Sequence, residues 1–377
     1  MRLAGGLEVR DLRLKSAPDA APQAPRDGTL SLTVGAGESM TVLGLRDSRA
    51  SDLLDTLAGQ ATAAAGHVLV GDLDVTASAA GYRRIGLVSA RDPLFAHLSV
   101  RRNIAFPLAA RRVPEPARGH RVDQLLALLG LEAEADLKPG RLAAAQAIRT
   151  AIARALAADP AVLLLDDPLA LLDPATRREM HPLLRRLAAA RGLALLIATR
   201  DREEALAMGG RIGILEQGRL LQVGTASELL DRPMDEQVAT VFGRANSLTG
   251  HVEDIEDDIA RVRLSAGPTV EAMAADGLTA GMLCVVCVRP ERVAVAFMAA
   301  ASAVPGDGAL ATDALPASLV EMAHLGDHLR LRFRLVGGGE LLVHRPAAQP
   351  TTQLKRDRPA ELAWQAAHAI AFPAPDR

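Results

Sequence analysis

The chain has 377 residues, with 43 Lys and Arg against 45 Asp and Glu and a formal net charge of −2. A chain of this length is too long for one compact core and indicates two domains. The balanced charge gives no sign of the basic surface that binds nucleic acid. No apolar run is long enough to span a bilayer and the start, MRLAGGLEVR, lacks a signal-peptide core, so we expect a soluble, cytoplasmic chain that reaches a membrane only through a partner.

The first segments predict two strands followed by a strand, a loop and a helix. Residues 7–14 and 29–35 alternate between polar and apolar side chains, as half-buried strands do. Residues 40–59 read MTVLGLRDSRASDLLDTLAG and predict strand, loop and helix. The predicted loop and the first residues of the helix are Gly44, Leu45, Arg46, Asp47, Ser48, Arg49, Ala50, Ser51 and Asp52.

The middle of the chain predicts helices that lead into a buried strand. Residues 111–140 contain VDQLLALLGLEAEAD at helical spacing, and Leu142 to Pro160 form an alanine-rich helical pattern. The run Val162 to Leu165 is typical of a parallel strand buried on both faces. Asp166 and Asp167 follow at its carboxyl end, the edge where open α/β sheets bind ligands. Paired acids at this edge fit two alternatives, a metal site or an inherited geometry without function.

The last part of the chain predicts a β-rich domain. Gly218 is expected to form the turn of a hairpin within residues 211–233. From about residue 240 the sequence changes to short alternating strands, which predict an all-β barrel. Cys284 and Cys287 form a CVVC, but their alternating apolar setting indicates ordinary strand residues and not a redox pair.

The order of these segments resembles the ATP-binding subunits of ABC transporters. An alanine-rich helix, an apolar strand ending in DDP and then LLDP match that family's signature helix, its Asp-Glu-Pro strand and its SALD. The segments VRPERV and LGDHLRLRF resemble the TOBE domain of sugar, iron, molybdate and polyamine importers, and Trp364 favours the polyamine branch. The resemblance extends over most of the chain.

That resemblance implies the fold and the domain boundaries. Residues 1–238 would form an α/β, P-loop NTPase-like ABC ATPase domain, with a helical subdomain at about 90–150. Residues 239–377 would form a small all-β, OB-like TOBE barrel with a regulatory role.

The resemblance implies that residues 44–52 form the nucleotide-binding loop, although several positions depart from the family's pattern GxSGxGKST. Gly44 keeps the first glycine and Ser51 the magnesium-binding hydroxyl, but Arg49 replaces the last glycine, Ala50 the lysine and Asp52 the threonine. A missing unit charge beside a phosphate is worth roughly 4 kcal/mol at an effective dielectric constant near 20. No aromatic precedes Tyr82, so the adenine-stacking side chain is absent as well.

The other catalytic positions have changed in the same way. Asp166 matches the magnesium-binding aspartate, whereas Ala90 stands at a glutamine that binds the metal. Asp167 replaces the catalytic glutamate and Arg200 the histidine that contacts the γ-phosphate. The signature LSGGQ is replaced by Leu142, Ala143, Ala144, Ala145 and Gln146.

One stretch, residues 93–106, keeps the family pattern and implies a surface that receives the coupling helix of a permease. Leu94, Phe95 and Leu98 would form its apolar patch, with Arg101 and Arg102 at the rim. The alternative is that these residues only pack the helical subdomain.

We therefore expect a nucleotide-binding-type subunit of an ABC importer for a polyamine-like or related small solute, with little or no ATP hydrolysis. The family implies ATP and magnesium as cofactors, although their binding here is in doubt. It also implies inner-membrane permeases and a second ATP-binding subunit, identical or different, as partners. Three alternatives stay open: an ATPase rebuilt around Arg46, Arg49 or Arg200, a ligand-sensing scaffold that works through its barrel without transport, and a gene that drifts without selection.

Overall fold

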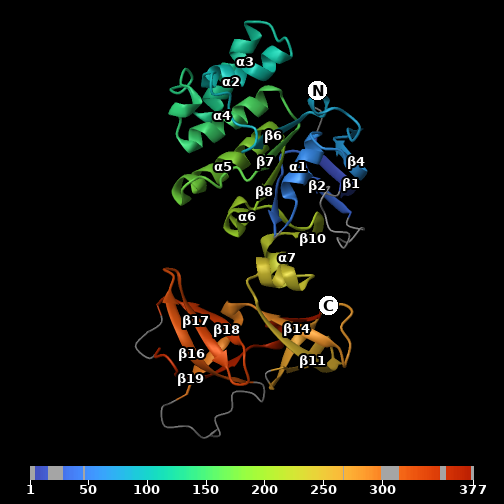
Figure 1. Cartoon of the computed structure of the whole chain (residues 1–377), viewed down its shortest axis with the longest axis vertical. Coiled ribbons are helices and arrows are strands. Elements are labelled where there is room, and N and C mark those ends of the chain that lie inside the picture. The colour runs from blue at the N-terminus through green and yellow to red at the C-terminus, as the bar shows by residue number, and fades with distance from the viewer. Residues whose placement is uncertain are drawn as a thin grey trace. The chain divides into compact units, whose positions relative to one another are not determined.

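The computed structural model of the chain describes residues 5–15, 29–45, 47–265, 267–298, 314–348 and 354–374. It divides into two compact units, Met1–Glu228 and Leu229–Arg377 (Figure 1). The sequence places the boundary about ten residues later, at 238. Residues 229–238 group with the second unit, where the following π-helical turn, Val238–Phe242, buries Phe242 completely and Ala239 packs against Val285.

The first unit contains two sheets. Its antiparallel sheet has the order β2-β1-β4-β5, made of β1 (Leu7–Leu14), β2 (Leu30–Val34), β4 (Ala63–Val70) and β5 (Leu73–Asp74). Its larger sheet has the order β10-β9-β3-β8-β7-β6, made of β3 (Ser39–Gly44), β6 (Ile85–Ser89), β7 (Val162–Asp166), β8 (Ala194–Thr199), β9 (Arg211–Glu216) and β10 (Arg219–Gly224). All pairs in the larger sheet are parallel except β10 with β9, and Gly218 makes their turn with φ of 82°.

Burial on both faces explains the continuous apolar run of β7. Val162 and Leu164 belong to the core shared with α1 (Ala50–Ala58) and the antiparallel sheet. Leu163 and Leu165 point to the opposite core, which includes residues of α5 (Pro174–Arg191). Since β3, β6, β7 and β8 run parallel, their carboxyl ends meet at one edge. The loop residues and acids predicted from the sequence lie at this edge.

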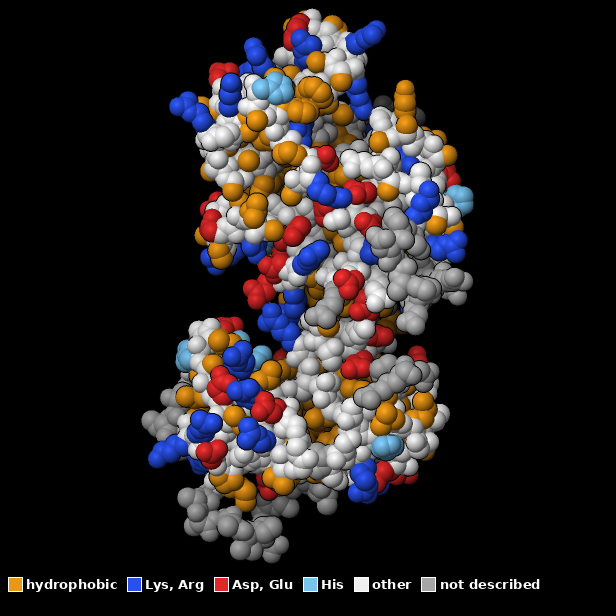
Figure 2. Space-filling model, in the orientation of Figure 1, with side chains coloured by type: hydrophobic (Ala, Val, Ile, Leu, Met, Phe, Trp, Pro, Cys, Tyr) orange, Lys and Arg blue, Asp and Glu red, His pale blue; other side chains and the backbone are white. Residues whose placement is uncertain are grey.

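Three helices form the helical subdomain. They are α2 (Val100–Ala110), α3 (Ala117–Leu129) and α4 (Ala144–Ala157), which pack on one another as Figure 1 shows. Hydrophobic side chains remain visible on the outer surface of this region among Lys and Arg side chains (Figure 2). The first unit also contains α6 (Arg202–Met208), and α7 (Ala226–Asp231) carries the boundary between the units. Within the described ranges, no helix is long and apolar enough to cross a membrane.

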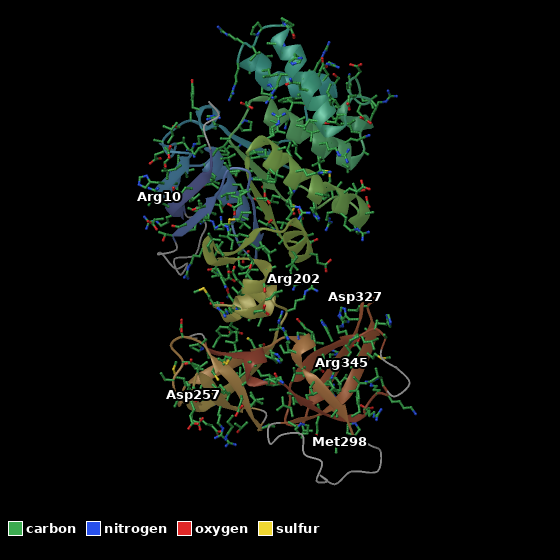
Figure 3. The ribbon with its side chains drawn as sticks, turned by 180° about the vertical axis from the view of Figure 1, so that it is seen from behind. Arg10, Arg202, Asp257, Met298, Asp327 and Arg345 are labelled. Atoms are coloured by element: carbon green, nitrogen blue, oxygen red, sulfur yellow. The ribbon has the colours of Figure 1, made fainter. Side chains whose placement is uncertain are left out.

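The second unit is built from strands. A closed barrel has the order β11-β12-β13-β20-β14, made of β11 (Asn246–Glu256), β12 (Ile259–Leu264), β13 (Thr269–Ala274), β14 (Leu283–Val288) and β20 (Ala369–Pro373). A five-stranded sheet has the order β15-β19-β16-β17-β18, made of β15 (Ala294–Phe297), β16 (Leu315–His324), β17 (His328–Leu335), β18 (Glu340–Pro346) and β19 (Pro359–Ala363). Asp327 marks the turn between β16 and β17 in Figure 3. One apolar core joins the barrel and the sheet.

These units confirm the predicted architecture, an α/β domain with a helical subdomain followed by a domain that contains a β-barrel. The cysteines agree with their interpretation as strand residues. Cys284 and Cys287 are buried, unbridged residues of β14 and belong to different apolar clusters. Burial raises the pKa of Cys284 to about 11 and that of Cys287 to about 12, so both thiols stay protonated.

Candidate functional site

The loop between β3 and α1 keeps a left-handed backbone at two positions that are not glycine. Asp47 and Arg49 both adopt left-handed conformations, with φ of 53° and 60°. Such φ values favour glycine, because a Cβ atom crowds the following carbonyl. Arg46, a residue of the same loop, lies outside the described residues.

Side chains of the loop are held by contacts with the chain itself. The hydroxyl of Ser48 is buried so closely beside Gly44 that a Cβ on that glycine would lie 2.4 Å from it. Arg49 forms an ion pair with Asp52 at 2.9 Å and donates to the backbone carbonyl of Lys15. Its guanidinium is therefore already engaged. Ala50, at the first position of α1, supplies no charge.

The structure brings together the two residues predicted to hold magnesium. Ser51 Oγ donates to Asp166 Oδ1 at 3.0 Å, and Ser89 Oγ lies 3.3 Å from Asp166 Oδ2. Ala90 sits exposed on the turn after β6 and offers no side-chain ligand. Among the residues that the structure describes, no group of three or more His, Cys, Asp or Glu side chains is arranged to hold a metal ion.

One residue of this site, Arg91, was missed from the sequence. Its guanidinium contacts Asp166 at 3.1 Å and Asp55 at 2.7 Å. Asp55 lies one helical turn after Ser51, so the two side chains share a face of α1. This spacing was a readable sign that an acid points toward Asp166. Nothing in the sequence indicated that Arg91 would reach across to both carboxylates.

Asp167 is half-buried directly after β7. Its backbone adopts φ of 47°, and its N–H donates to the carbonyl of Ala198 at 2.8 Å. Burial and the neighbouring Asp166 raise the pKa of Asp167, while Arg200 and Thr199 counteract the shift. Arg200 is exposed at the end of β8. The predicted catalytic pair is thus close enough for electrostatic interaction.

Beside this pair lies a buried carboxyl, Glu204, that sequence reasoning also missed. It is 1 % exposed, accepts a hydrogen bond from Thr199 Oγ1 at 2.9 Å, and its Oε1 has no partner. Burial raises the pKa of Glu204 to about 7, and Asp167 adds to the shift. The sequence showed only consecutive acids at a helix start, Glu203 and Glu204, without indicating which one faces inward.

The signature position forms the start of α4. Leu142 and Ala143 precede the helix, with Ala143 as the N-cap, while Ala144, Ala145 and Gln146 form its first turn. Gln146 Oε1 accepts from the N–H of Ala143 at 2.8 Å, and Gln146 Nε2 donates to Glu134 at 2.8 Å. This is half of a capping box, because Ala143 has no hydroxyl to return the bond.

Two of the five predicted docking residues, Leu94 and Phe95, line an open groove of about 610 Å³ beside the helical subdomain. Its lining includes Leu94, Phe95, Phe106 and Pro107, together with Arg154, whose guanidinium lies 5.2 Å from the Phe95 ring centroid. The rings of Phe95 and Phe106 are 4.5 Å apart between centroids. Phe106, which is 48 % exposed, was not predicted as part of the patch.

The remaining predicted docking residues are placed differently. Leu98 is partly buried outside the groove lining, and Arg101 pairs with Asp123 of α3. Arg102 is exposed on α2. The loop that carries Phe95, just before α2, is fixed by Asn103. Its fully buried amide exchanges hydrogen bonds with the backbone of Phe95 at 2.9 and 3.2 Å.

A mostly parallel sheet with a phosphate-type loop, a strand ending in acids, a helical subdomain and a β-barrel unit defines an ABC-type ATP-binding subunit. Comparison with known proteins agrees: residues 28–170 match the ABC transporter family and residues 286–372 match the TOBE domain. The chain belongs to the family of ABC importer ATP-binding subunits with a TOBE domain.

Similar proteins include importers of different solutes. The chain is 33 % identical to a spermidine/putrescine import ATP-binding protein of Pseudomonas aeruginosa, over 87 % of this chain and 86 % of that protein. It is 32 % identical to a protein of the same description from Rubrobacter xylanophilus, over 90 % and 88 %. It is 35 % identical to a sulfate/thiosulfate import ATP-binding protein of Xanthomonas campestris, over 92 % and 94 %.

Proposed function

We propose that this chain is a subunit of an ABC importer that docks to a permease and does not itself hydrolyse ATP. The observation that carries the proposal is the loop before α1, which keeps left-handed backbone at Asp47 and Arg49 but has Ala50 in the lysine position. A triphosphate would meet the Asp47 carboxylate and Cβ atoms where the family offers backbone N–H groups and an ammonium. These residues do not fit magnesium-bound ATP as the family binds it.

The proposal extends to the assembly. In the family, each nucleotide lies between the phosphate loop of one subunit and the signature of the other. Ala50 weakens the phosphate loop of this chain, and the alanines at 143–145 weaken its signature. Both nucleotide sites of a dimer with an intact partner subunit would therefore be impaired. We infer a dimeric, peripheral subunit at the inner membrane, held there by its permease.

The transported solute is proposed from the relatives. Two of the similar proteins are described as spermidine/putrescine importers, which favours a polyamine-like solute. The sulfate/thiosulfate relative leaves a small oxyanion as the alternative.

Binding of ATP tests the proposal at the loop. Calorimetry in low salt should detect weak or no binding of magnesium-ATP, because the lysine charge and the glycines are missing. Micromolar affinity would contradict the proposal. If that affinity disappeared in Arg46→Ala or Arg200→Ala, the result would favour the alternative of an ATPase whose site is rebuilt around these arginines. Arg49 is a weaker candidate for this role, because Asp52 and Lys15 already engage it.

Capture of a permease tests the docking groove. Phe106 is the variant of choice, since it is half-exposed on α2, whereas Phe95 is more buried and also contacts the Arg154 guanidinium. Phe106→Ala should change the free energy of unfolding by less than about 1 kcal/mol and should abolish copurification with a co-expressed permease. Leu128→Ala, on α3 and 39 % exposed, is the matched control and should keep full capture. Full capture of the permease by Phe106→Ala would refute the proposal that the groove is the docking site.

The ligand-sensing alternative is favoured by one observation in the second unit. A cavity of about 230 Å³ is lined by residues that include Asp231, Cys287, Arg289, Arg292 and His368. Arg289 pairs there with Asp231 at 2.9 Å. A small-molecule-dependent rise in melting temperature, in a chain that captures no permease, would favour this alternative.

A further inference from the structure

A single guanidinium nitrogen bridges two carboxylates at the edge of the large sheet. Arg91 Nη2 lies 2.9 Å from Asp55 Oδ1 and 3.1 Å from Asp166 Oδ2, and Arg91 Nη1 lies 2.7 Å from Asp55 Oδ2. The pairing with Asp55 therefore uses both oxygens of that carboxylate. Such a two-point bond fixes the guanidinium in one orientation.

The two carboxylates are shielded from solvent, whereas the arginine approaches from outside. The side chains of Asp55 and Asp166 are 15 % and 11 % exposed, and that of Arg91 is 54 % exposed. Carboxylates with little water around them need a positive partner or donors. Ser51 and Ser89 supply hydroxyls to Asp166, and Arg91 supplies the positive charge.

We propose that the Arg91 guanidinium takes the place of the divalent cation at Asp166, so that the chain itself closes this position to metal. The inference deepens the proposed function and rests on it, because it assumes that Asp166 no longer has to serve magnesium-bound ATP. Arg91 then acts as a built-in counter-ion that keeps the edge of the sheet formed without nucleotide.

Competition for the same oxygen is the physical reason. Magnesium requires oxygen ligands in near-octahedral geometry at short distances. Asp166 Oδ2 already accepts a hydrogen bond from Arg91. Arginine cannot give up its charge by deprotonation, and both of its terminal nitrogens donate to Asp55. A dication could enter only if Arg91 moved away from both carboxylates. Ala90, the residue before it, offers no replacement ligand.

Binding of Mn²⁺ alone, without nucleotide, tests the proposal by electron paramagnetic resonance. The full-length wild-type chain should bind no stoichiometric Mn²⁺ that depends on Asp166. Arg91→Gln should bind one Mn²⁺ at least tenfold more tightly than the wild type, and Asp166→Asn in that background should remove the binding. Arg91→Lys keeps the charge but loses the two-point bond, and it should bind Mn²⁺ more weakly than Arg91→Gln. Arg118→Gln removes a comparable surface pair with Glu115 and should behave like the wild type.

Two results would overturn the inference. Saturable Mn²⁺ binding by the wild type that Asp166→Asn abolishes would show that Arg91 does not exclude the cation, and this result needs no Arg91 variant to fold. A folded Arg91→Gln without any gain would show that Arg91 is not what excludes it. ATP turnover of the wild type separates the two levels of the account. Turnover would defeat the proposed function, whereas Mn²⁺ binding without turnover would defeat only the role of Arg91.

Discussion

Replacing Glu204 with Gln should remove much of the pH dependence of folding stability. The side chain is buried beside Asp167 and Thr199, and its pKa is raised from 4.5 to about 7, chiefly by burial. Between these two values the folded chain holds a proton that the unfolded chain releases. The stability contributed by the protonated form is therefore fully present below pH 4.5. It decreases as the pH rises above 4.5 and is lost once the pH passes about 7.

The size of the effect follows from the shift. Each pKa unit corresponds to about 1.4 kcal/mol, so ionised Glu204 costs about 3 kcal/mol above pH 7. Glu204→Gln stays neutral and retains an oxygen for the Thr199 hydroxyl. At pH 8 it should be more stable than the wild type by up to about 3 kcal/mol, and at pH 4.5 by almost nothing.

Urea unfolding at a series of pH values between 4 and 8 measures this difference. The matched control is Glu203→Gln, its exposed neighbour on α6, which should keep the wild-type pH dependence. Asp167 leaves a residual pH dependence of the same sign, because burial and Asp166 also raise its pKa. If Glu204→Gln lost stability with rising pH as steeply as the wild type, the assignment of the buried proton would be wrong.

Two further substitutions test the motif positions through stability. Ala143→Ser should raise the free energy of unfolding by about 1 kcal/mol, because Gln146 already forms its half of the capping box; urea unfolding without a gain would argue against this geometry. Asp47→Gly should also stabilise the chain, by roughly 0.5 to 1 kcal/mol, since φ is 53° at this residue. Destabilisation in a thermal melt would mean that the Asp47 side chain makes an essential contact.

Much of the fold could be predicted because its elements depend on local patterns. The strand Val162–Asp166 was readable from its apolar run, and the hairpin at Gly218 from its turn residue. The pairing of Ser51 with Asp166, at 3.0 Å, followed from the family motif. The extra sheet of the second unit could not be separated from the barrel, because strands of both structures alternate in the same way.

The parts of the site that were missed depend on contacts between distant segments. Arg91 reaches Asp55 and Asp166 across 36 and 75 residues of sequence. That contact is decided by the turn after β6, which no local pattern describes. Glu204 was missed for a related reason: whether an acid at a helix start is buried depends on which face packs against the sheet.

Steady-state ATP turnover by the purified chain tests the central claim most directly. We expect a rate at background with magnesium and millimolar ATP, unchanged by Asp167→Asn. Restoring the single residue Ala50→Lys should not rescue it, because catalytic residues that act as a unit are not additive. A rate near 1 per second or above, in the ordinary range of enzymes, that falls clearly in Asp167→Asn would contradict the account.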